Sequence, residues 1–233
     1  MQIKENIMED RIDILMPTYN GEKYISEQID SILNQTYQNF RLIISDDTST
    51  DNTCEILKKY SEKDNRIVLY LQPSNLGVVK NIEFLFNKVE SKYYMLADQD
   101  DYWLPEKVEK SFETLVKNNA DLVFGDLEVV DENLNTIYPS FCDYMFLNRK
   151  IKKCIDDYRV NYLYNCVTGC TVLAKSDFLE KVLPLPTNSK MVIHDYWIGI
   201  IYALSGKLAY MEEKYIKYRQ HRRQSGWNKP FIT

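Results

Sequence analysis

Residues 12–53 read IDILMPTYNGEKYISEQIDSILNQTYQNFRLIISDDTSTDNT, and this stretch decides the fold. An apolar, β-rich run over Ile12–Met16 leads into a polar turn, and a second such run covers Arg41–Ser45. Between the two runs, four apolar residues recur at helical spacing and predict one buried helix face. They are Ile25, Ile29, Ile32 and Leu33. A strand, a helix and a second strand in this order are typical of a βα unit in a parallel sheet.

The same alternation continues through the first half of the chain. Further strands are predicted at Arg66–Leu71 and Tyr93–Ala97, with segments of helical period around them. We therefore predict an α/β protein with a mostly parallel, Rossmann-like central sheet flanked by helices. The alternation breaks in residues 131–159, which lack a clean period and predict a variable insertion. Regular patterns return with a strand at Cys170–Ala174 and a helix at Asp195–Leu204.

Composition excludes several classes of protein. The chain has 233 residues, of which 45% are hydrophobic and 27% charged, as in ordinary globular proteins. Its net charge of −5 provides no bulk positive field to hold nucleic acid. The longest mainly apolar stretch, Ile198–Leu204, is far shorter than the roughly 20 residues that span a membrane. The polar start lacks the apolar core of a signal peptide, so we expect a cytoplasmic protein.

Cysteine and histidine usage limits the metal chemistry. The five cysteines show no zinc-ligand or Cys-x-x-Cys spacing, which predicts reduced and mostly buried thiols. They are Cys54, Cys142, Cys154, Cys166 and Cys170. Two histidines, His194 and His221, are too few for a histidine-rich metal site. Any bound metal is therefore expected to be held mainly by carboxylates.

Polar groups follow each predicted strand of the first half, at the edge where open α/β sheets bind ligands. They are PTYNGE (17–22), DDTS (46–49), PSNLG (73–77) and DQDD (98–101). The three carboxylates of the last group would repel one another without a cation. Mg²⁺ or Mn²⁺ fits, because these ions bind carboxylate oxygens and share their coordination with substrate phosphates. Helix capping and solvation explain the other acids, and Lys80, equally well.

Five motifs, in this order, resemble the successive motifs of family 2 glycosyltransferases. They are PTYNG (17–21), SILNQTY (31–37), ISDDTSTDNT (44–53), NLG (75–77) and DQDD (98–101). The resemblance covers about residues 10–126. It implies the nucleotide-diphospho-sugar transferase fold called GT-A, as a single domain over residues 1–233. The nucleotide-sugar-binding half would span about 10–126, and the acceptor-binding half about 127–233.

The resemblance also implies donor-side roles. The predicted nucleotide-sugar-binding residues are Pro17, Tyr19, Glu22, Asp46, Lys80, Asp98, Gln99 and Arg219. Among them, Asp46 would contact the base and Asp98 would approach the ribose. Asp100 would reach the Mn²⁺ or Mg²⁺ ion on the donor diphosphate, and His221 would complete the metal shell. Arg219 would add positive charge beside the leaving diphosphate.

Acceptor chemistry in this family usually comes from an acidic pair, commonly Glu-Asp, whose Asp is the catalytic base. Here HDYW (194–197) stands in the corresponding place, with His instead of the usual Glu. The resemblance therefore implies Asp195 as the base, and Gly169, His194 and Trp197 as acceptor contacts. An Asp at a helix start is also a common cap, and Trp197 is equally compatible with a core position.

HDYW together with YRQH (218–221) resembles the rhamnosyltransferase-like branch of the family, which uses dTDP-rhamnose and builds bacterial surface polysaccharide. A UDP-hexose is the alternative donor. We expect a metal-dependent, inverting glycosyltransferase acting on a hydroxyl of a glycan, glycolipid or glycoprotein. It would be free in the cytoplasm or peripherally associated with the inner face of the membrane.

Other functions remain open on this reading of the sequence. A non-catalytic sugar-nucleotide or glycan-binding module would keep the same binding residues. A nucleotidyltransferase usually opens with a Gly-rich, Lys/Arg-bearing phosphate loop, which this sequence lacks. A receiver-type signalling domain would be about half as long and would have no place for the HDYW segment.

Overall fold

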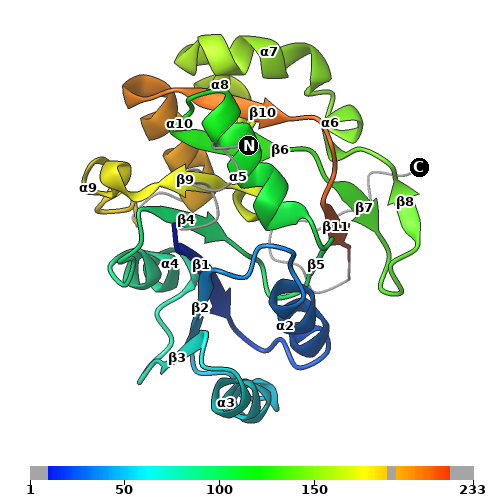
Figure 1. Cartoon of the computed structure of the whole chain (residues 1–233), viewed down its shortest axis with the longest axis vertical. Coiled ribbons are helices and arrows are strands. Elements are labelled where there is room, and N and C mark those ends of the chain that lie inside the picture. Colours follow the sequence, from blue (N-terminus) through cyan, green and yellow to red (C-terminus); the bar gives the residue numbers. More distant parts are fainter. Residues whose placement is uncertain (1–9, 188–192, 221–233) are drawn as a thin grey trace.

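A mostly parallel sheet forms the centre of the molecule (Figure 1). The computed structural model of the chain describes residues 10–187 and 193–220. Within them, one seven-stranded sheet has the order β10-β6-β9-β4-β1-β2-β3. The strands are β1 (Ile12–Thr18), β2 (Phe40–Asp46), β3 (Ile67–Leu71), β4 (Tyr93–Leu96), β6 (Leu122–Gly125), β9 (Leu173–Lys175) and β10 (Leu208–Met211). Paired neighbours are parallel except at β9, which is antiparallel to β4 and β6. The predicted α/β class is confirmed.

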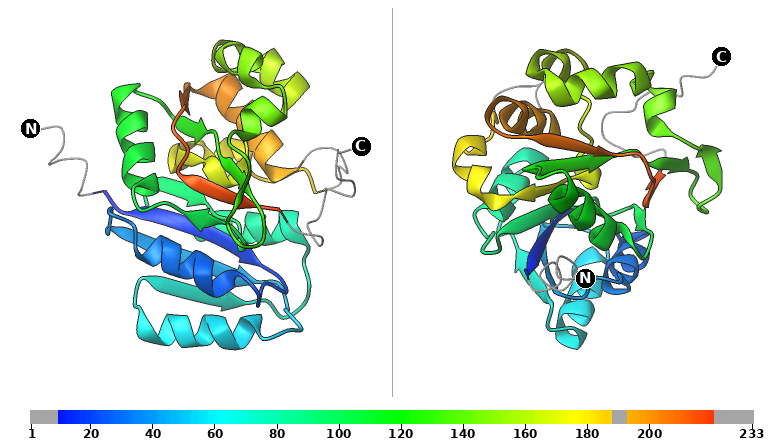
Figure 2. Two further views of the ribbon diagram at one scale, coloured as in Figure 1. Left: turned by 90° about the vertical axis from the view of Figure 1, so that its right-hand side faces the viewer. Right: turned by 45° about the horizontal axis from the view of Figure 1, so that its top comes forward.

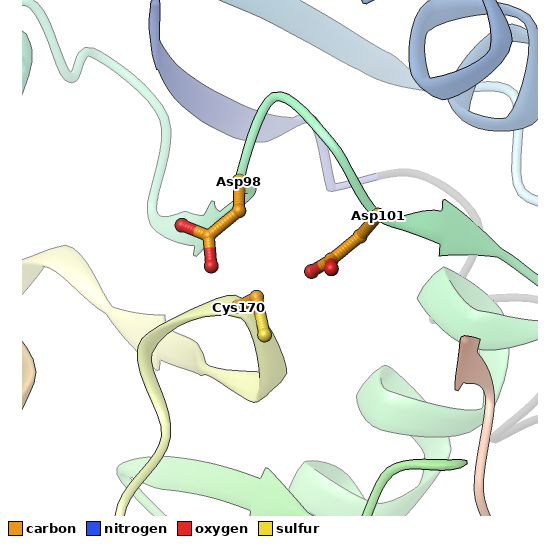
Figure 3. Close-up of side chains that lie close together, drawn as sticks. All are labelled: Asp98, Asp101 and Cys170. Atoms are coloured by element: carbon orange, nitrogen blue, oxygen red, sulfur yellow. The ribbon is translucent and has the colours of Figure 1, made fainter. Parts of the chain in front are cut away.

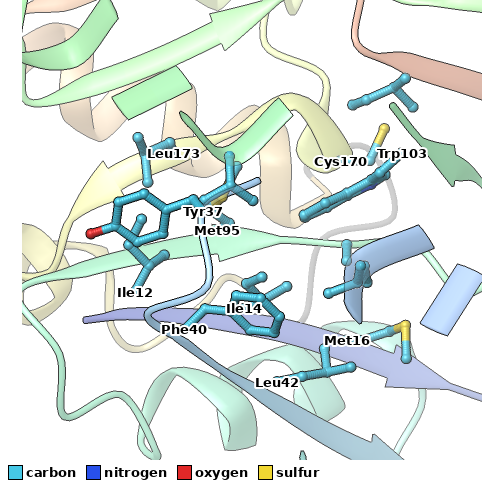
Figure 4. Close-up of a cluster of buried hydrophobic side chains, with 14 of the residues drawn as sticks. Ile12, Ile14, Met16, Tyr37, Phe40, Leu42, Met95, Trp103, Cys170 and Leu173 are labelled. Carbon is cyan, nitrogen blue, oxygen red and sulfur yellow. The ribbon is translucent and has the colours of Figure 1, made fainter. Parts of the chain in front are cut away.

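Helices cover both faces of this sheet and create two hydrophobic cores. The helices concerned are α2 (Ile25–Leu33), α3 (Thr53–Lys63), α4 (Val78–Phe86), α5 (Lys107–Lys117), α9 (Leu179–Val182) and α10 (His194–Ser205). Buried residues of α2, α3 and α5 pack in the first core, part of which Figure 4 shows around Ile14 and Leu42. Buried residues of α4, α9 and α10 pack in the second core. The predicted α2 face, from Ile25 to Ile32, is buried in the first core.

A second, smaller sheet lies beside the edge at which the parallel strands end. In the described part of the chain it has the order β5-β11-β7-β8. Its strands are β5 (Tyr102–Trp103), β7 (Glu128–Val130), β8 (Thr136–Tyr138) and β11 (Ile216–Arg219). β5 directly follows the DQDD group, and β11 pairs with it. This pairing brings the end of β11 to the acidic loop, although the two lie more than a hundred residues apart.

Residues 131–159 are more regular than the sequence predicts. The segment contains β8 and the helices α6 (Phe141–Tyr144) and α7 (Asn148–Asp156), and α8 (Tyr158–Tyr164) starts within it. α6 and α8 have only four and seven residues, too few for a periodic pattern to stand out, and α7 has few apolar residues among its charged ones. The predicted strand at Cys170–Ala174 is instead a 3₁₀ turn, η1 (Gly169–Thr171), followed by β9. A second 3₁₀ turn, η2 (Ser176–Phe178), leads into α9.

Strand order reverses at β1, which fixes where ligands can bind. β2 and β3 follow on one side of β1, whereas β4 lies on its other side. The loops after β1 and β4 therefore meet at the point where the strand order reverses, and such switch points are where open α/β sheets hold ligands. α7 and α8 lie at the end of the molecule opposite α3 (Figure 2).

A buried ion pair holds the other ends of β1, β2 and β4 together. Asp13 is fully buried and accepts hydrogen bonds from the Arg41 guanidinium at 2.9 and 3.0 Å. It also accepts from the backbone N–H groups of Glu90 and Ser91 at 2.8 and 3.0 Å. Burial alone would raise the pKa of Asp13, but these donors outweigh it and lower the pKa.

We expect Asp13→Ala to destabilise the protein by about 3–5 kcal/mol, because it leaves the buried Ser91 N–H and hydroxyl groups without their acceptor and removes one of the two carboxylates that pair with Arg41. Urea unfolding measures this change. The matched control is Asp64→Ala, which removes the carboxylate that pairs with Arg66 near the surface and should cost about 1 kcal/mol or less. Equal losses in the two variants would contradict the assigned role of Asp13.

Candidate functional site

Gln99, in the middle of the acidic group, joins the loops that follow β1 and β4. Its Oε1 accepts a hydrogen bond from the backbone N–H of Tyr19 at 2.9 Å, and its Nε2 donates to the Tyr19 carbonyl at 3.0 Å. A Cβ atom at Gly21 would lie 2.5 Å from the same Oε1, so a side chain at position 21 would displace the Gln99 amide. Gln99 therefore shapes the loop, and its contact with a nucleotide stays a prediction.

The two acids at the end of β2 are also engaged by the protein itself. Asp46 is 1% exposed and accepts hydrogen bonds from the Thr18 and Ser49 hydroxyl groups at 2.9 and 2.6 Å. Asp47 accepts from the backbone N–H groups of Leu76 and Gly77 at 2.6 and 2.8 Å. The Asp46 carboxylate is not accessible for the predicted contact with a base. Both acids instead hold neighbouring loops in place.

A pocket of about 670 Å³ opens where the loops after β1, β2 and β4 meet. Glu22, Gln99 and Asp100, all from the predicted donor and metal sets, line it. Tyr19, in the loop after β1, is 47% exposed and offers a ring for stacking. The pocket is therefore bordered by the loops in which the sequence places nucleotide recognition.

The remaining predicted donor residues differ in exposure. Pro17 is half-buried near the end of β1, and Lys80 is exposed on α4. Glu22 accepts hydrogen bonds from the backbone N–H and the side-chain amide of Asn52, at 3.0 and 2.9 Å. This contact ties the loop after β1 to the start of α3.

The acidic loop meets two segments from the second half of the chain. Oxygen atoms of Asp98 and Asp101 and the sulfur of Cys170 all lie within 4.8 Å of one another (Figure 3). Burial, together with the charges of Asp100 and Asp195, raises the pKa of Asp98 to about 7. The fold has thus placed Asp195, from α10, close enough to the loop for its charge to be felt there.

Asp101 and Cys170 are the buried side of this group. Burial raises the pKa of the Asp101 carboxyl well above its usual range, as do the charges of Asp98 and Asp100. Burial likewise raises the pKa of the Cys170 thiol. Lys107 lies nearby with its Nζ 3.4 Å from the centre of the Trp103 ring, and burial lowers its pKa to about 7. A protonated acid and an uncharged thiol are poor ligands for a metal ion.

The donor set therefore fits a hard divalent cation on its accessible side. Asp98 and Asp100 are both partly exposed, and Asp100 lines the pocket. Carboxylate oxygens are the ligands that Mg²⁺ and Mn²⁺ prefer, and a cation would offset the repulsion that raises the pKa of Asp98. Asp98 and Asp101 belong to the compact group with Cys170, whereas the predicted metal ligand Asp100 is not part of it.

Arg219 lies beneath the acidic loop and is 2% exposed. Its guanidinium donates to the carbonyl oxygens of Asp100 and Glu132 at 2.9 and 2.6 Å, and it pairs with Glu27. Its backbone N–H donates to Asp101 at 3.3 Å. These contacts position the loop, and the contact of Arg219 with a diphosphate stays a prediction. The predicted metal ligand His221 lies outside the described residues.

Asp195 begins the first turn of α10 and is held by backbone groups. One carboxylate oxygen accepts a hydrogen bond from the Gly169 N–H at 3.3 Å, and the other accepts from the Tyr196 N–H at 2.6 Å. A Cβ atom at Gly169 would lie 3.2 Å from His194 Nε2, so a small residue is needed for the two segments to approach. Gly169, His194 and Asp195 thus lie together, as predicted.

His194 and Trp197 differ in their surroundings. Burial lowers the pKa of His194, and its Nδ1 has no hydrogen-bond partner among the described residues. Trp197 donates its indole N–H to the Val182 carbonyl at 2.8 Å and packs against the second core. The structure favours the core position for Trp197 over the predicted acceptor contact.

Sequence reasoning missed the parts of the site that depend on the second sheet. Glu132 lines the pocket, yet it lies in a hairpin that no sequence pattern marked. Cys170 was interpreted as a buried thiol, without its position beside the acids. All five cysteines lie in described segments and carry no disulfide, as predicted. The one signal for Cys170 was its place at the start of the predicted strand that precedes HDYW.

The description "Glycosyl transferase family 2" belongs to a family model that matches residues 13–183. The chain belongs to this family. It is a glycosyltransferase, and its α/β fold is shared with solved GT-A structures. The resemblance to family 2 is confirmed, whereas its rhamnosyltransferase-like branch stays a prediction.

Curated relatives align along most of the chain. "Uncharacterized glycosyltransferase MJ1057" of Methanocaldococcus jannaschii is 32% identical over 211 residues, which are 89% of this chain and 70% of that protein. "UDP-Glc:alpha-D-GlcNAc-diphosphoundecaprenol beta-1,3-glucosyltransferase WfgD" of Escherichia coli is 29% identical over 195 residues, which are 82% of this chain and 69% of that protein.

Solved structures share the fold at lower identity. S. aureus TarS 1–349 in complex with UDP-GlcNAc has a TM-score of 0.70 and 19% identity, covering 92% of this chain and 60% of that one. The mannosyltransferase PcManGT from Pyrobaculum calidifontis, in complex with GDP-Man and Mn²⁺, has a TM-score of 0.67 and 16% identity. This alignment covers 94% of this chain and 59% of that one. The chain thus spans less than two thirds of either structure.

The raised pKa of Asp98 makes the stability of the metal-free protein depend on pH. Between 3.8 and about 7, the native state holds a proton that the unfolded chain has lost. Stability from this group is therefore full below this range and is lost as the pH rises through it. We expect the free energy of unfolding to fall by about 1–3 kcal/mol more in the wild type than in Asp98→Asn.

Urea unfolding at several pH values, in the presence of a chelator, measures this difference. Asp177→Asn, in the exposed turn η2, is the matched control and should follow the wild type. Parallel pH curves for the wild type and Asp98→Asn would contradict the placement of Asp98 in a buried acidic cluster.

Proposed function

We propose that this glycosyltransferase moves a sugar from a nucleoside-diphosphate donor to a hydroxyl of a glycan, glycolipid or glycoprotein, with inversion at the anomeric carbon. One observation carries the proposal. The Asp195 carboxylate, held by the Gly169 and Tyr196 N–H groups, lies close enough to raise the pKa of Asp98 in the donor-side loop. This proximity supports a base and a diphosphate site that act together.

The donor is proposed to enter the pocket bordered by Glu22 and Asp100, with its base near the exposed ring of Tyr19. We propose a UDP-hexose or dTDP-rhamnose, since both carry a pyrimidine and a diphosphate. The TarS structure with UDP-GlcNAc and the UDP-Glc donor in the name of WfgD support the first. The motifs HDYW and YRQH support the second.

Mg²⁺ or Mn²⁺ is the proposed cofactor, held by Asp98 and Asp100. When bound, the ion would neutralise negative charge on the donor diphosphate. Without the ion, these acids would repel the donor, because Asp100 lines the pocket and Asp98 belongs to the same loop. The structure of PcManGT in complex with GDP-Man and Mn²⁺ supports this choice for a protein of the same fold.

Asp195 is proposed to act as the base. The acceptor oxygen forms a bond to the anomeric carbon while the bond from that carbon to the phosphate oxygen breaks. The nucleoside diphosphate leaves with the electron pair, and Asp195 takes the proton of the hydroxyl. A carboxylate is a weak base toward an alcohol, so proton transfer must accompany bond formation. A neutral His194, as its lowered pKa indicates, leaves the negative charge of Asp195 unpaired for this step.

The acceptor is proposed to belong to bacterial surface polysaccharide synthesis. WfgD is named as acting on a GlcNAc-diphosphoundecaprenol, which is a sugar on a lipid carrier. An acceptor of this class would be met at the inner face of the membrane. Among the described residues, no helix is long and apolar enough to cross a membrane.

We expect Asp195→Asn to reduce transfer by about a thousandfold, because the amide cannot accept the proton. Donor affinity should stay within a few-fold of the wild type, since Asp195 does not line the donor pocket. Transfer is measured as release of nucleoside diphosphate, and donor affinity by calorimetry. Asp177→Asn is the control and should retain full activity. Wild-type turnover by Asp195→Asn would contradict the proposal that Asp195 is the base.

Asp100→Ala should instead abolish the dependence of donor binding on the metal. Removal of one ligand weakens the binding of the ion, and the remaining acids then repel the donor diphosphate. We expect Mn²⁺-dependent donor affinity to fall at least about tenfold. Calorimetric titration of UDP with and without Mn²⁺ measures the change, with Asp177→Ala as the control. An unchanged response to Mn²⁺ would contradict the proposed coordination.

A panel of nucleotide sugars with Mn²⁺ separates the proposed function from its alternatives. Slow donor hydrolysis that releases nucleoside diphosphate from one donor supports a glycosyltransferase and identifies the donor. Release of pyrophosphate would indicate a nucleotidyltransferase. Binding without any turnover, even with acceptor glycans added, would indicate a non-catalytic module.

A further inference from the structure

Helices α7 and α8 form a surface on which exposed aromatic and apolar side chains lie beside lysines. Tyr162, Leu163 and Tyr164 on α8 are 60%, 69% and 45% exposed. Lys152 and Lys153 on α7 are exposed, and Lys150 is partly exposed. We call these six residues the α7–α8 surface. It lies at one end of the molecule, on the side of α10 and away from α3 (Figures 1 and 2).

The charge of this region is opposite to that of the whole chain. Residues 148–164 contain five Lys or Arg and two Asp, whereas the whole chain carries a net charge of −5. Asp157, one of these two acids, is engaged with Arg159 at 2.8 Å. The lysines of α7 are therefore not balanced by the acids of their own segment, and the region favours a negatively charged partner.

The side chains have the arrangement that an interfacial surface requires. Lys150 Nζ lies 3.7 Å from the centre of the Tyr164 ring, so ring and ammonium are side by side. Aromatic rings favour the depth of lipid headgroups, and lysines beside them reach anionic phosphates. Ile151 and Cys154 are buried and fix α7 on the body of the protein. The surface is thus already formed before it meets a partner.

A continuous aromatic contact joins this surface to the proposed base. The Tyr162 ring stacks on Tyr196, with ring centres 6.3 Å apart, and the Tyr196 hydroxyl donates to the Tyr162 carbonyl. Tyr196 follows Asp195 directly in α10. A partner bound to the α7–α8 surface would therefore lie next to the acceptor side of the site.

We infer that the α7–α8 surface binds the surface of an anionic lipid bilayer. Exposed aromatic groups enter the headgroup region and the three lysines contact lipid phosphates. A second copy of the chain is a poorer occupant, because a symmetric contact would bring the same lysines face to face. Asp195 would then meet acceptors at the bilayer, and this consequence rests on the proposed function. The binding of the surface to the bilayer does not rest on it.

The test uses the 233-residue chain and lipid vesicles without donor or acceptor. We expect it to co-float with vesicles in which phosphatidylglycerol makes up about one third of the lipid, and not with phosphatidylcholine alone. Replacing Lys150, Lys152 and Lys153 together by Gln should lower the partition coefficient by about a hundredfold. The matched control replaces Lys58, Lys59 and Lys63 of α3 by Gln and should bind as the wild type does.

A second pair of variants tests the apolar part. Leu163→Ser should lower binding by about tenfold, whereas Leu204→Ser, at an exposed leucine near the end of α10, should not. Equal binding to neutral vesicles, binding that the triple α7 variant retains, or no binding at all would each overturn the inference. Concentration-dependent dimerisation that Leu163→Ser abolishes would overturn it in favour of a second copy.

Failure of this inference is distinguishable from failure of the proposed function. Donor hydrolysis in solution needs no vesicle, so the triple α7 variant should hydrolyse the donor at the wild-type rate. A chain that binds vesicles without any turnover would keep the inference and refute the proposed function. A chain that turns over donor without binding vesicles would do the reverse.

Discussion

Repulsion between carboxylates at the end of β4 is the constraint on which the rest of the site depends. Asp98, Asp100 and Asp101 follow one another closely, and α10 adds Asp195 to the same region. Neighbouring segments of the protein hold these acids in place. Arg219 fixes the backbone of the loop from below, and the Gly169 N–H group holds Asp195. The like charges are thereby kept close together, and the proposed cation would relieve their repulsion.

Much of the donor side could be predicted because its signals are local. Strand, helix and turn patterns in residues 12–126 identified the parallel sheet, and the polar groups after its strands marked the edge that binds ligands. The side-chain roles within those groups could not be predicted. Whether Gln99 or Asp46 faces a ligand or its own backbone depends on atoms from other loops, which a motif does not contain.

The acceptor side was harder to predict because of one antiparallel strand. β9 runs against β4 and β6, so its beginning lies where the parallel strands end. Residues before this strand, including Gly169 and Cys170, therefore reach the site. Only the family resemblance indicated Gly169, and no pattern placed Cys170 beside the acids. The small sheet of β5, β7, β8 and β11 was missed because its strands are two to four residues long. Such lengths carry no periodic signal.

The contact between Gln99 and Gly21 links the choice of residue at two distant positions. A side chain at position 21 would collide with the Gln99 amide, and a different residue at position 99 would leave the Tyr19 backbone without its partners. A substitution at either position alone is therefore expected to disrupt the loop after β1. An effort to redesign donor preference in this enzyme would have to vary positions 21 and 99 jointly, as one unit of sequence.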